Sequence, residues 1–165
     1  MKTTDDSANT LHNYSVYVTK IGELIIASDG EAITALKFKH RATVSGKNEA
    51  SELTDRAAKQ IEEYLAGKRR QFDLPLRPQG TKFQCLVWTA LLGIPYGETR
   101  SYKQIAQAIG NPNASRAVGM ANNKNPISII IPCHRVIGSA GKLVGYGGGL
   151  DLKKKLLDME AASWK

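Results

Sequence analysis

Apolar residues in the first 40 positions follow a pattern that predicts three short strands. Residues 14–18 are rich in β-branched and aromatic side chains, and residues 23–27 form a second apolar run. Asp29-Gly30 is a hairpin signal, and residues 32–38 alternate as a half-buried strand does. We therefore expect a small N-terminal β-sheet.

A helical stripe follows the predicted sheet. From residue 49 to residue 66, apolar side chains recur at three- and four-residue spacing, and Gly67 provides a stop. Pro75, Pro78 and Gly80 then mark a connector at residues 73–80. We expect an N-terminal α/β domain over residues 1–78 and a second domain over residues 79–165.

The second half of the chain has the pattern of a helical domain. Thr81 and Gln84 form a capping box at the start of a helix. The apolar side of this helix consists of Phe83, Val87, Trp88, Leu91 and Leu92. Short helices are expected at residues 101–109 and from 114 to about 121, joined by a turn, which is the pattern of a helix-turn-helix. The predicted fold class is α+β, in which a small sheet-plus-helix domain packs on a mostly helical, winged-helix-like domain.

The positive charge of the chain is unevenly distributed. The formal net charge is +8, yet residues 1–80 hold 12 basic and 11 acidic residues, whereas residues 81–165 hold 11 basic and 4 acidic ones. A concentrated excess of positive charge is expected where a protein faces a polyanion such as nucleic acid. A generally basic, solubilising surface is the alternative.

The second helix of the helix-turn-helix has an unusual composition. Arg116 is its one side chain suited to reading base edges, and the residues that follow it are small. Small residues allow the backbone to approach DNA closely, as in a minor groove, and predict little sequence preference. Alternatively, Ala117, Val118 and Gly119 pack against other helices, and both interpretations can hold on opposite faces.

A reactive cysteine is the clearest chemical candidate. Residues 127–132 are predicted to form a buried strand that leads into Cys133 and His134. The thiolate is the nucleophilic form of cysteine, and a neighbouring imidazole can accept the thiol proton directly or through water. Neighbouring residues of a strand point to opposite faces, so the chain must turn at Cys133. Cys85, which has no nearby histidine, is expected to be an inert buried thiol.

Several classes of protein are excluded by composition. Two cysteines and three histidines, without metal-ligand spacing, predict neither a disulfide framework nor a bound metal. No apolar run has the length of a membrane-spanning helix, so no membrane partner is expected. Residues 1–13 are polar and lack the apolar core of a signal peptide. We therefore expect a cytoplasmic protein.

Five motifs together resemble one family. The run IPCHRVI at residues 131–137 closely resembles the highly specific active-site signature of the O6-alkylguanine-DNA alkyltransferases, also called methylated-DNA–protein-cysteine methyltransferases. Agreement continues in IPYGETRSY (94–102), SRAVG (115–119), Asn125-Pro126 and GYGGG (145–149). The close resemblance covers about residues 80–160. Over residues 1–80 it depends on the general layout and on the helix end at residues 62–67.

The resemblance implies DNA repair by direct reversal of damage. An alkyl group, such as methyl, would pass from O6 of guanine to Cys133 in one irreversible turnover. In the family, the histidine matched by His134 acts on the cysteine through water, and the glutamate matched by Glu160 orients that histidine. Tyr102 matches the tyrosine that protonates N3 of the leaving base, and Asn125 matches the asparagine that ties down the active-site turn. Asp158 is a rival carboxylate that does not match the motif.

The resemblance also implies how DNA is bound. The damaged nucleotide must flip out of the duplex, and Arg116 matches the arginine that fills the vacated stack. The residues implied in DNA binding from the minor groove are Tyr102, Lys103, Asn111, Arg116, Ala117, Gly119 and Ser139. The residues implied in the base pocket are Pro132, Val136, Tyr146 and Gly147. Some family members carry serine where Gly147 stands, which leaves only a main-chain contact there.

Partners and cofactors follow from the same resemblance. The expected partner is double-stranded DNA that contains O6-alkylguanine, with O4-alkylthymine left open, bound by a monomer without a cofactor. Some family members bind zinc in the N-terminal domain, and this chain lacks the cysteines for it.

Two other functions compete with alkyl transfer. The first is a protein that binds alkylated DNA without transferring the group, although such relatives replace the cysteine. The second is a cysteine hydrolase or thiol-redox enzyme that uses Cys133 and His134, which leaves the basic half and Arg116 unexplained.

Overall fold

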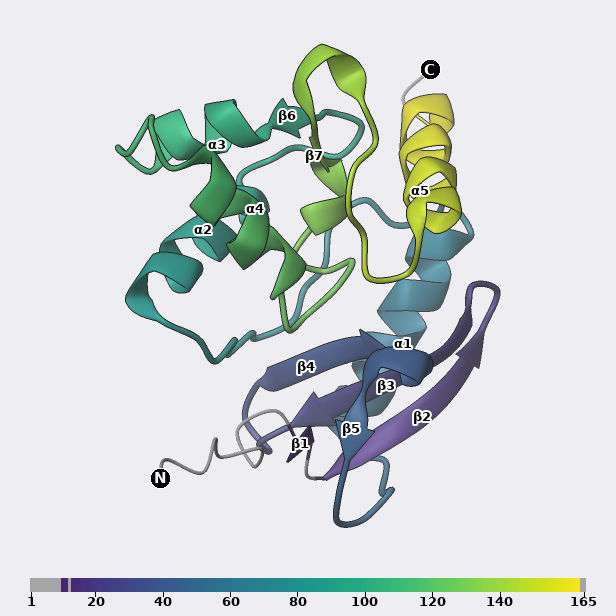
Figure 1. Ribbon diagram of the computed structural model, residues 1–165. Coiled ribbons are helices and arrows are strands. Elements are labelled where there is room, and N and C mark those ends of the chain that lie inside the picture. The colour runs from purple at the N-terminus through teal and green to yellow at the C-terminus, as the bar shows by residue number, and fades with distance from the viewer. Residues whose placement is uncertain (1–9, 12, 164–165) are drawn as a thin grey trace, which may run out of the picture.

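The computed structural model describes residues 10–11 and 13–163 (Figure 1). The polar stretch 1–13, which supports the expectation of a cytoplasmic protein, lies outside the described residues except at positions 10, 11 and 13. Within the described ranges, no helix combines the length and the apolar character needed to cross a membrane.

The N-terminal part contains the predicted sheet. Strands β2 (Tyr14–Thr19), β3 (Gly22–Ser28) and β4 (Ile33–Phe38) form an antiparallel sheet in the order β2-β3-β4. A separate parallel pair joins β1 (Thr10–Leu11) to β5 (Thr43–Val44). The three strands expected from the apolar pattern are confirmed.

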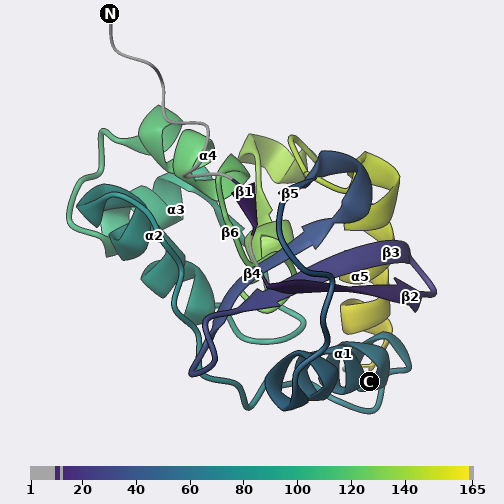
Figure 2. The same cartoon turned by 90° about the horizontal axis from the view of Figure 1, so that it is seen from below.

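Helix α1 (Glu52–Leu65) covers one face of this sheet (Figure 2). It begins three residues later than the apolar stripe suggested, because Ser51 caps it. The Ser51 hydroxyl accepts the Thr54 amide hydrogen and the Thr54 hydroxyl accepts the Ser51 amide hydrogen, which completes a capping box. Gly67 ends the helix in the left-handed conformation, with φ of 74°, as its position predicted.

The C-terminal part is mostly helical (Figure 1). Its helices are α2 (Lys82–Leu92), α3 (Tyr102–Ala108), α4 (Ser115–Asn123) and α5 (Leu150–Ser163). Two short parallel strands, β6 (Arg100–Ser101) and β7 (Val136–Ile137), lie beside α3. Single 3₁₀ turns are η2 (Lys39–Arg41), η3 (Cys133–Arg135) and η4 (Ser139–Gly141). The α+β class and the α3–turn–α4 arrangement agree with the sequence prediction.

Two expectations for α2 need correction. Leu92 was placed on the apolar side, but it is 50% exposed, since it occupies the last helical position before the chain turns at Gly93. Cys85 is half-buried rather than buried, and its thiol contacts the Gly80 carbonyl oxygen at 3.9 Å.

The predicted strand at residues 127–132 is wrong, although the segment is mostly buried. Ile127 forms a single bridge to Leu36 of β4, and the chain then turns sharply, with Ile129 at φ of 72°. The Ile131 amide donates back to the Ile127 carbonyl at 3.0 Å. A short apolar run signals burial without distinguishing a strand from a buried turn. Here, backbone hydrogen bonding within the segment itself favours the turn.

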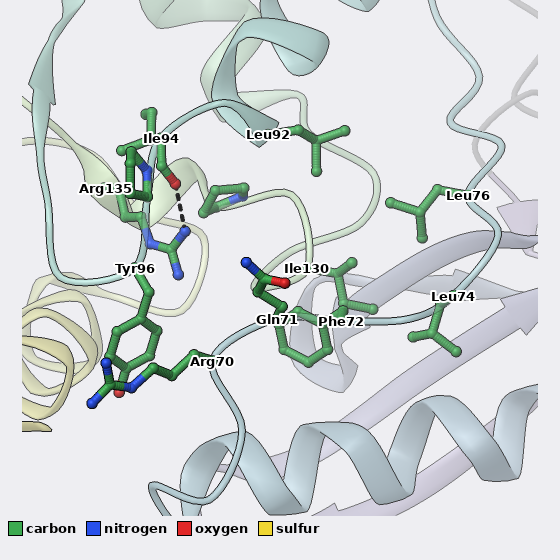
Figure 3. Close-up of a pocket in the computed structure, with 12 residues that line it drawn as sticks. Arg70, Gln71, Phe72, Leu74, Leu76, Leu92, Ile94, Tyr96, Ile130 and Arg135 are labelled. Atoms are coloured by element: carbon green, nitrogen blue, oxygen red, sulfur yellow. Dashed lines mark hydrogen bonds between the residues drawn. The ribbon is translucent and has the colours of Figure 1, made fainter.

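The connector between the two halves adds to the edge of β4. The Ile33 amide donates to the Pro75 carbonyl at 2.8 Å, and the Arg77 amide donates to the Ile33 carbonyl at 2.8 Å. A cavity of about 270 Å³ lies between the connector and the C-terminal part (Figure 3). Phe72 and Leu74 line it from one side, and Arg135 lines it from the other. The connector is therefore hydrogen-bonded to the N-terminal sheet and faces the C-terminal part across this cavity.

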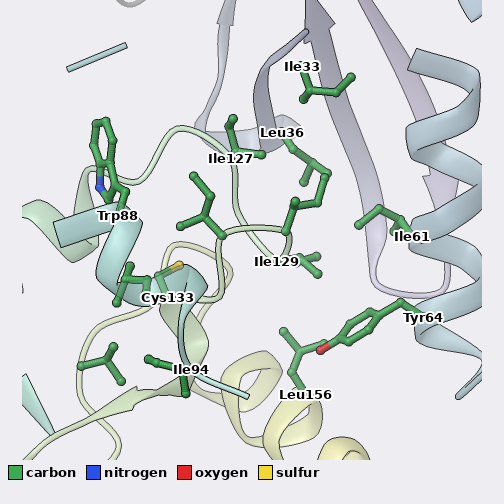
Figure 4. Packing of buried hydrophobic residues seen from close by; sticks show 14 of the residues in the cluster. Ile33, Leu36, Ile61, Tyr64, Trp88, Ile94, Ile127, Ile129, Cys133 and Leu156 are labelled. Carbon is green, nitrogen blue, oxygen red and sulfur yellow. The ribbon is translucent and has the colours of Figure 1, made fainter. Parts of the chain in front are cut away.

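One hydrophobic core runs through both halves of the chain (Figure 4). Its members come from the sheet, α1, α2, the buried turn and α5, and include Leu36, Ile61, Tyr64, Trp88, Ile127, Ile129, Cys133 and Leu156. A continuous core fixes the relative positions of the elements that contribute to it, because close-packed interiors deform little. Cys133 is therefore held in a rigid setting.

Candidate active site

The chain turns at Cys133, as the chemistry of a Cys-His pair requires. The residue begins η3, in which the Arg135 amide donates to the Pro132 carbonyl at 3.0 Å. The turn replaces the strand that would have sent Cys133 and His134 to opposite faces. Cys133 is only 5% exposed, so its sulfur lies in the protein interior.

Burial raises the pKa of the Cys133 thiol above its ordinary value. A hydrogen bond with the Asn125 side chain and the positive charge of Lys153 oppose this effect without cancelling it. The resting thiol is therefore protonated at neutral pH. Because the thiolate is the nucleophile, the site needs a base that can take the thiol proton.

His134 has the properties of that base. The imidazole is fully buried, and its Nε2 lies 2.8 Å from Oε2 of Glu160. An ionised carboxylate only accepts hydrogen bonds, so Nε2 carries the proton and Nδ1 is the basic nitrogen. Nδ1 is buried and has no hydrogen-bond partner among the described residues. Burial also lowers the pKa of His134, so the imidazole is neutral and able to accept a proton near pH 7.

Glu160 accepts hydrogen bonds from three residues of the site. Besides His134, it accepts a hydrogen bond from the Tyr64 hydroxyl at 3.2 Å and one from Nε of Arg135 at 2.6 Å. Burial alone would raise the pKa of this carboxyl, but the hydrogen bonds from His134 and Arg135, together with the positive charge of Arg135, outweigh burial and lower it. Glu160 is therefore ionised. The rival carboxylate, Asp158, is exposed and pairs with Lys154 instead.

Tyr64 and Arg135 are members of this network that the sequence did not single out. Tyr64 comes from α1, and its hydroxyl also lies 3.3 Å from Nε2 of His134. Arg135 is buried and donates a second hydrogen bond, from Nη1 to the Ile94 carbonyl at 2.8 Å. The helical spacing of Tyr64 from Ile61 was a usable signal, because it placed a polar hydroxyl on the buried face of α1.

Two asparagines hold the backbone around Cys133. The Asn125 side chain donates to the Ile131 carbonyl at 2.8 Å and accepts the Ile127 amide hydrogen at 3.0 Å. The structure thus places Asn125 across the buried turn. Asn122, which sequence reasoning missed, donates to the Cys133 carbonyl at 3.4 Å. Both amides restrain the backbone that leads into the reactive sulfur.

Lys153 holds the loop between β7 and α5. Its side chain is fully buried, and its ammonium donates to the carbonyls of Val136, Val144 and Gly145 at 2.6, 2.9 and 3.2 Å. Burial lowers its pKa. This lysine was also missed, since its position in a Lys-Lys-Lys run gives no indication that one of the three faces inward.

Two tyrosines lie beside the sulfur and the imidazole. The Tyr102 hydroxyl donates to the Val144 carbonyl at 3.2 Å, and burial together with the nearby Cys133 raises its pKa. Its phenol therefore remains protonated and available as a donor. The Tyr146 ring packs edge-on against His134, with ring centres 6.4 Å apart, and its buried hydroxyl has no partner among the described residues.

The four residues expected in the base pocket occupy different surroundings. Val136 is fully buried, Pro132 lines the cavity of Figure 3, and Gly147 lines a separate cavity of about 300 Å³. Gly148 in the same loop has no room for a side chain, because an added Cβ would lie 2.8 Å from the Phe38 ring. The loop can therefore pack this closely only with glycine at that position.

The residues expected to contact DNA lie on and around α3 and α4. Tyr102, Lys103 and Ser139 line one groove of about 590 Å³. Arg116 and Ala117 are exposed on α4, and Asn111 is exposed in the turn before it. Gly119 is half-buried near the Tyr102 ring. Val118 is fully buried, so α4 uses one face for packing and leaves the other open.

Both halves of the chain match family models of known proteins. Residues 82–162 match the family model described as 6-O-methylguanine DNA methyltransferase, DNA binding domain, and residues 13–78 match the model of its ribonuclease-like domain. The chain belongs to the 6-O-methylguanine DNA methyltransferase family.

Individual relatives of this methyltransferase are similar along most of their length. The methylated-DNA–protein-cysteine methyltransferase of Methanosarcina acetivorans is 49% identical over 153 residues, which cover 90% of this chain and 98% of the relative. The methylated-DNA–protein-cysteine methyltransferase of Mycobacterium bovis is 46% identical over 151 residues, which cover 90% of this chain and 92% of the relative. The crystal structure of Mycobacterium tuberculosis OGT in complex with DNA superposes with a TM-score of 0.84 at 47% identity, covering 93% of this chain and 94% of that one.

The role of Lys153 in holding the loop of this methyltransferase can be tested directly. We expect Lys153→Met to lower the free energy of unfolding by about 2–4 kcal/mol, because the buried Val136 carbonyl and two partly buried carbonyls lose their donor. Amide hydrogen exchange of residues 144–149 should accelerate as the loop loosens. Lys154→Met, at an exposed position one residue along, is the matched control and should change stability by less than about 0.5 kcal/mol. Equal effects of the two substitutions would show that Lys153 does not hold the loop.

Proposed function

We propose that this protein repairs DNA by moving an alkyl group from O6 of guanine in duplex DNA onto the sulfur of Cys133. The single observation that carries the proposal is a buried thiol beside a neutral imidazole whose free Nδ1 is a proton acceptor, with Nε2 held by Glu160. Membership of the methyltransferase family supports the same reaction.

Transfer begins with the loss of the Cys133 thiol proton. The Cys133 thiol gives its proton, through a water molecule, to Nδ1 of His134, and Glu160 stabilises the resulting imidazolium. The sulfur lone pair then attacks the alkyl carbon in line with the carbon–O6 bond. A sulfur–carbon bond forms, the carbon–O6 bond breaks, and its electron pair leaves with guanine. Tyr102 donates a proton to N3 of the leaving base.

The product explains why each molecule acts once. A thioether has no carbonyl carbon that water could attack, unlike the acyl-enzymes of cysteine hydrolases. The alkylated sulfur also lies in the protein core. The protein is therefore consumed by the reaction, without a cofactor.

Access to the base requires nucleotide flipping. A sulfur buried this deeply cannot reach O6 inside a duplex, and extrusion of a nucleotide costs a few kcal/mol, less for a damaged base. In this proposal α4 enters the minor groove, and Arg116 fills the vacated stack, because its exposed side chain stands next to small residues. One monomer acts on one lesion. The free thiol must stay reduced, which favours the cytoplasm.

A non-transferring protein that binds alkylated DNA is the alternative. Incubation with duplex DNA that contains O6-methylguanine, followed by mass spectrometry, separates the two functions. We expect a mass increase of one methyl group on the peptide that contains Cys133. In Cys133→Ser the adduct should be absent while DNA binding persists. An unmodified Cys133 peptide after saturating DNA binding would favour the alternative.

The role of Arg116 predicts a difference between two substrates. Arg116→Ala should slow transfer from duplex DNA by at least about tenfold, because the flipped state loses on the order of 1.4 kcal/mol or more of stabilisation. Transfer from free O6-methylguanine should change little. The test compares the single-turnover rates of the wild-type protein and the variant with each of the two substrates. Equal losses would show that Arg116 does not act on the duplex.

Tyr64 predicts a shift in pH dependence. In Tyr64→Phe, the Glu160 carboxylate loses one hydrogen-bond donor, so its pKa rises towards that of an ordinary buried carboxyl. A group with a depressed pKa supports the site above that pKa, and the support is lost as pH falls. The acidic limb of the transfer rate should therefore move to higher pH, and the rate at neutral pH should fall about tenfold, the order of one charge-assisted hydrogen bond.

The matched control for this test is Tyr17→Phe. Tyr17 also belongs to the N-terminal part, and its hydroxyl donates to Asp55 at 2.7 Å and lies 2.9 Å from the Thr54 hydroxyl, outside the network. Its removal should leave the pH profile unchanged. If both variants shifted the profile alike, or if Tyr64→Phe only lowered thermal stability, Tyr64 would have a structural role alone.

A further inference from the structure

The side chains that line the cavity beside Gly147 carry an excess of positive charge. Its walls carry the basic side chains of Lys37 from β4, Arg41 from η2 and Lys124 at the end of α4. None of the described residues that line it is an aspartate or a glutamate. Among the described residues, no ion pair uses any of the three cations. Positive charge is thus gathered around about 300 Å³ of space without compensation.

Two of the cations, Lys37 and Lys124, are close enough to interact. Burial, and then the charge of Lys124, lowers the pKa of Lys37. Repulsion between like charges destabilises the folded state unless an anion offsets it. Asn123 and Ser128 also line the cavity and add neutral hydrogen-bond donors. Such a set of donors suits an anion with several acceptor oxygens, such as a phosphate group.

The position of the cavity indicates the source of that phosphate. In Figure 2, α4, β5 and the loop before α5 lie along the upper side of the molecule, whereas α1 lies along the lower side. The cavity is built between those upper elements, because Lys124 follows α4 and Arg41 packs 3.9 Å from the position of a Cβ on Gly147. It therefore adjoins the C-terminal end of α4, the helix that carries the exposed Arg116.

We propose that Lys37, Arg41 and Lys124 form a binding site for a backbone phosphate of the DNA duplex, which extends the DNA interface from α3 and α4 onto the N-terminal domain. This inference depends on the proposed function, since it takes α4 as the DNA-facing helix. It assigns a DNA contact to a domain whose residues were absent from the sequence-based set.

Binding to undamaged duplex DNA tests the site. The triple variant Lys37→Gln, Arg41→Gln, Lys124→Gln should weaken binding on the order of tenfold near 0.1 M salt. The slope of log affinity against log salt concentration should become shallower by about 0.9 for one lost phosphate contact. Fluorescence anisotropy from 50 to 200 mM salt gives both values. Arg41→Gln alone, at an exposed position where folding is not at risk, should change both in the same direction.

The control removes equal charge elsewhere. Lys20, Lys59 and Lys68 are exposed on α1 or near its C-terminal end, away from α4, and their triple change to glutamine lowers the net charge by the same amount. This control should retain the wild-type salt slope. Equal slopes in the two triple variants would overturn the site, because the effect would then come from net charge.

Two further measurements separate the possible failures. Transfer from free O6-methylguanine should be unchanged in the cavity variants. If the wild-type protein does not carry out this transfer at all, the proposed function itself is refuted. Transfer from O6-carboxymethylguanine and O6-methylguanine in DNA should slow equally. If affinity for DNA stayed constant and only the carboxymethyl substrate slowed, the cavity would hold the anionic substituent and the phosphate proposal would be wrong.

Discussion

The organisation of the site depends on one buried carboxylate. Glu160 is 1% exposed and ionised, and an unpaired charge in that position would cost several kcal/mol. Its two oxygens accept hydrogen bonds from His134, Arg135 and Tyr64, which come from the η3 turn and from α1. Satisfying this charge therefore brings together three elements that are far apart in the sequence, and it does so at the reactive cysteine.

The same carboxylate determines how protons move. Because Glu160 accepts the hydrogen on Nε2 of His134, the basic nitrogen is Nδ1, and burial keeps the ring neutral. Burial also raises the pKa of Cys133, so the thiol is protected until a base removes its proton. A consumable protein benefits from this arrangement, since a permanently exposed thiolate would react with other electrophiles before it met a lesion.

The N-terminal domain takes a larger part in function than the sequence indicated. Tyr64 reaches from α1 into the proton network, and Phe38 packs against Tyr146 and leaves room only for glycine at position 148. The basic cavity lies at the same junction, with two of its three cations supplied by this domain. The sheet, the glycine-rich loop and the basic cavity are therefore packed together, so a change in one affects the others.

The sequence by itself determined the elements and the reactive group. Periodicity and capping residues placed the three strands and the first four of the five described α-helices, because those signals are local, and the motif around Cys133 indicated the chemistry. Only the tertiary structure decided that residues 127–132 form a buried turn, that Lys153 rather than Lys154 faces inward, and that Tyr64 reaches Glu160 across 96 positions. These outcomes depend on which buried polar groups find partners once the core closes, and a local pattern carries no information about partners that distant.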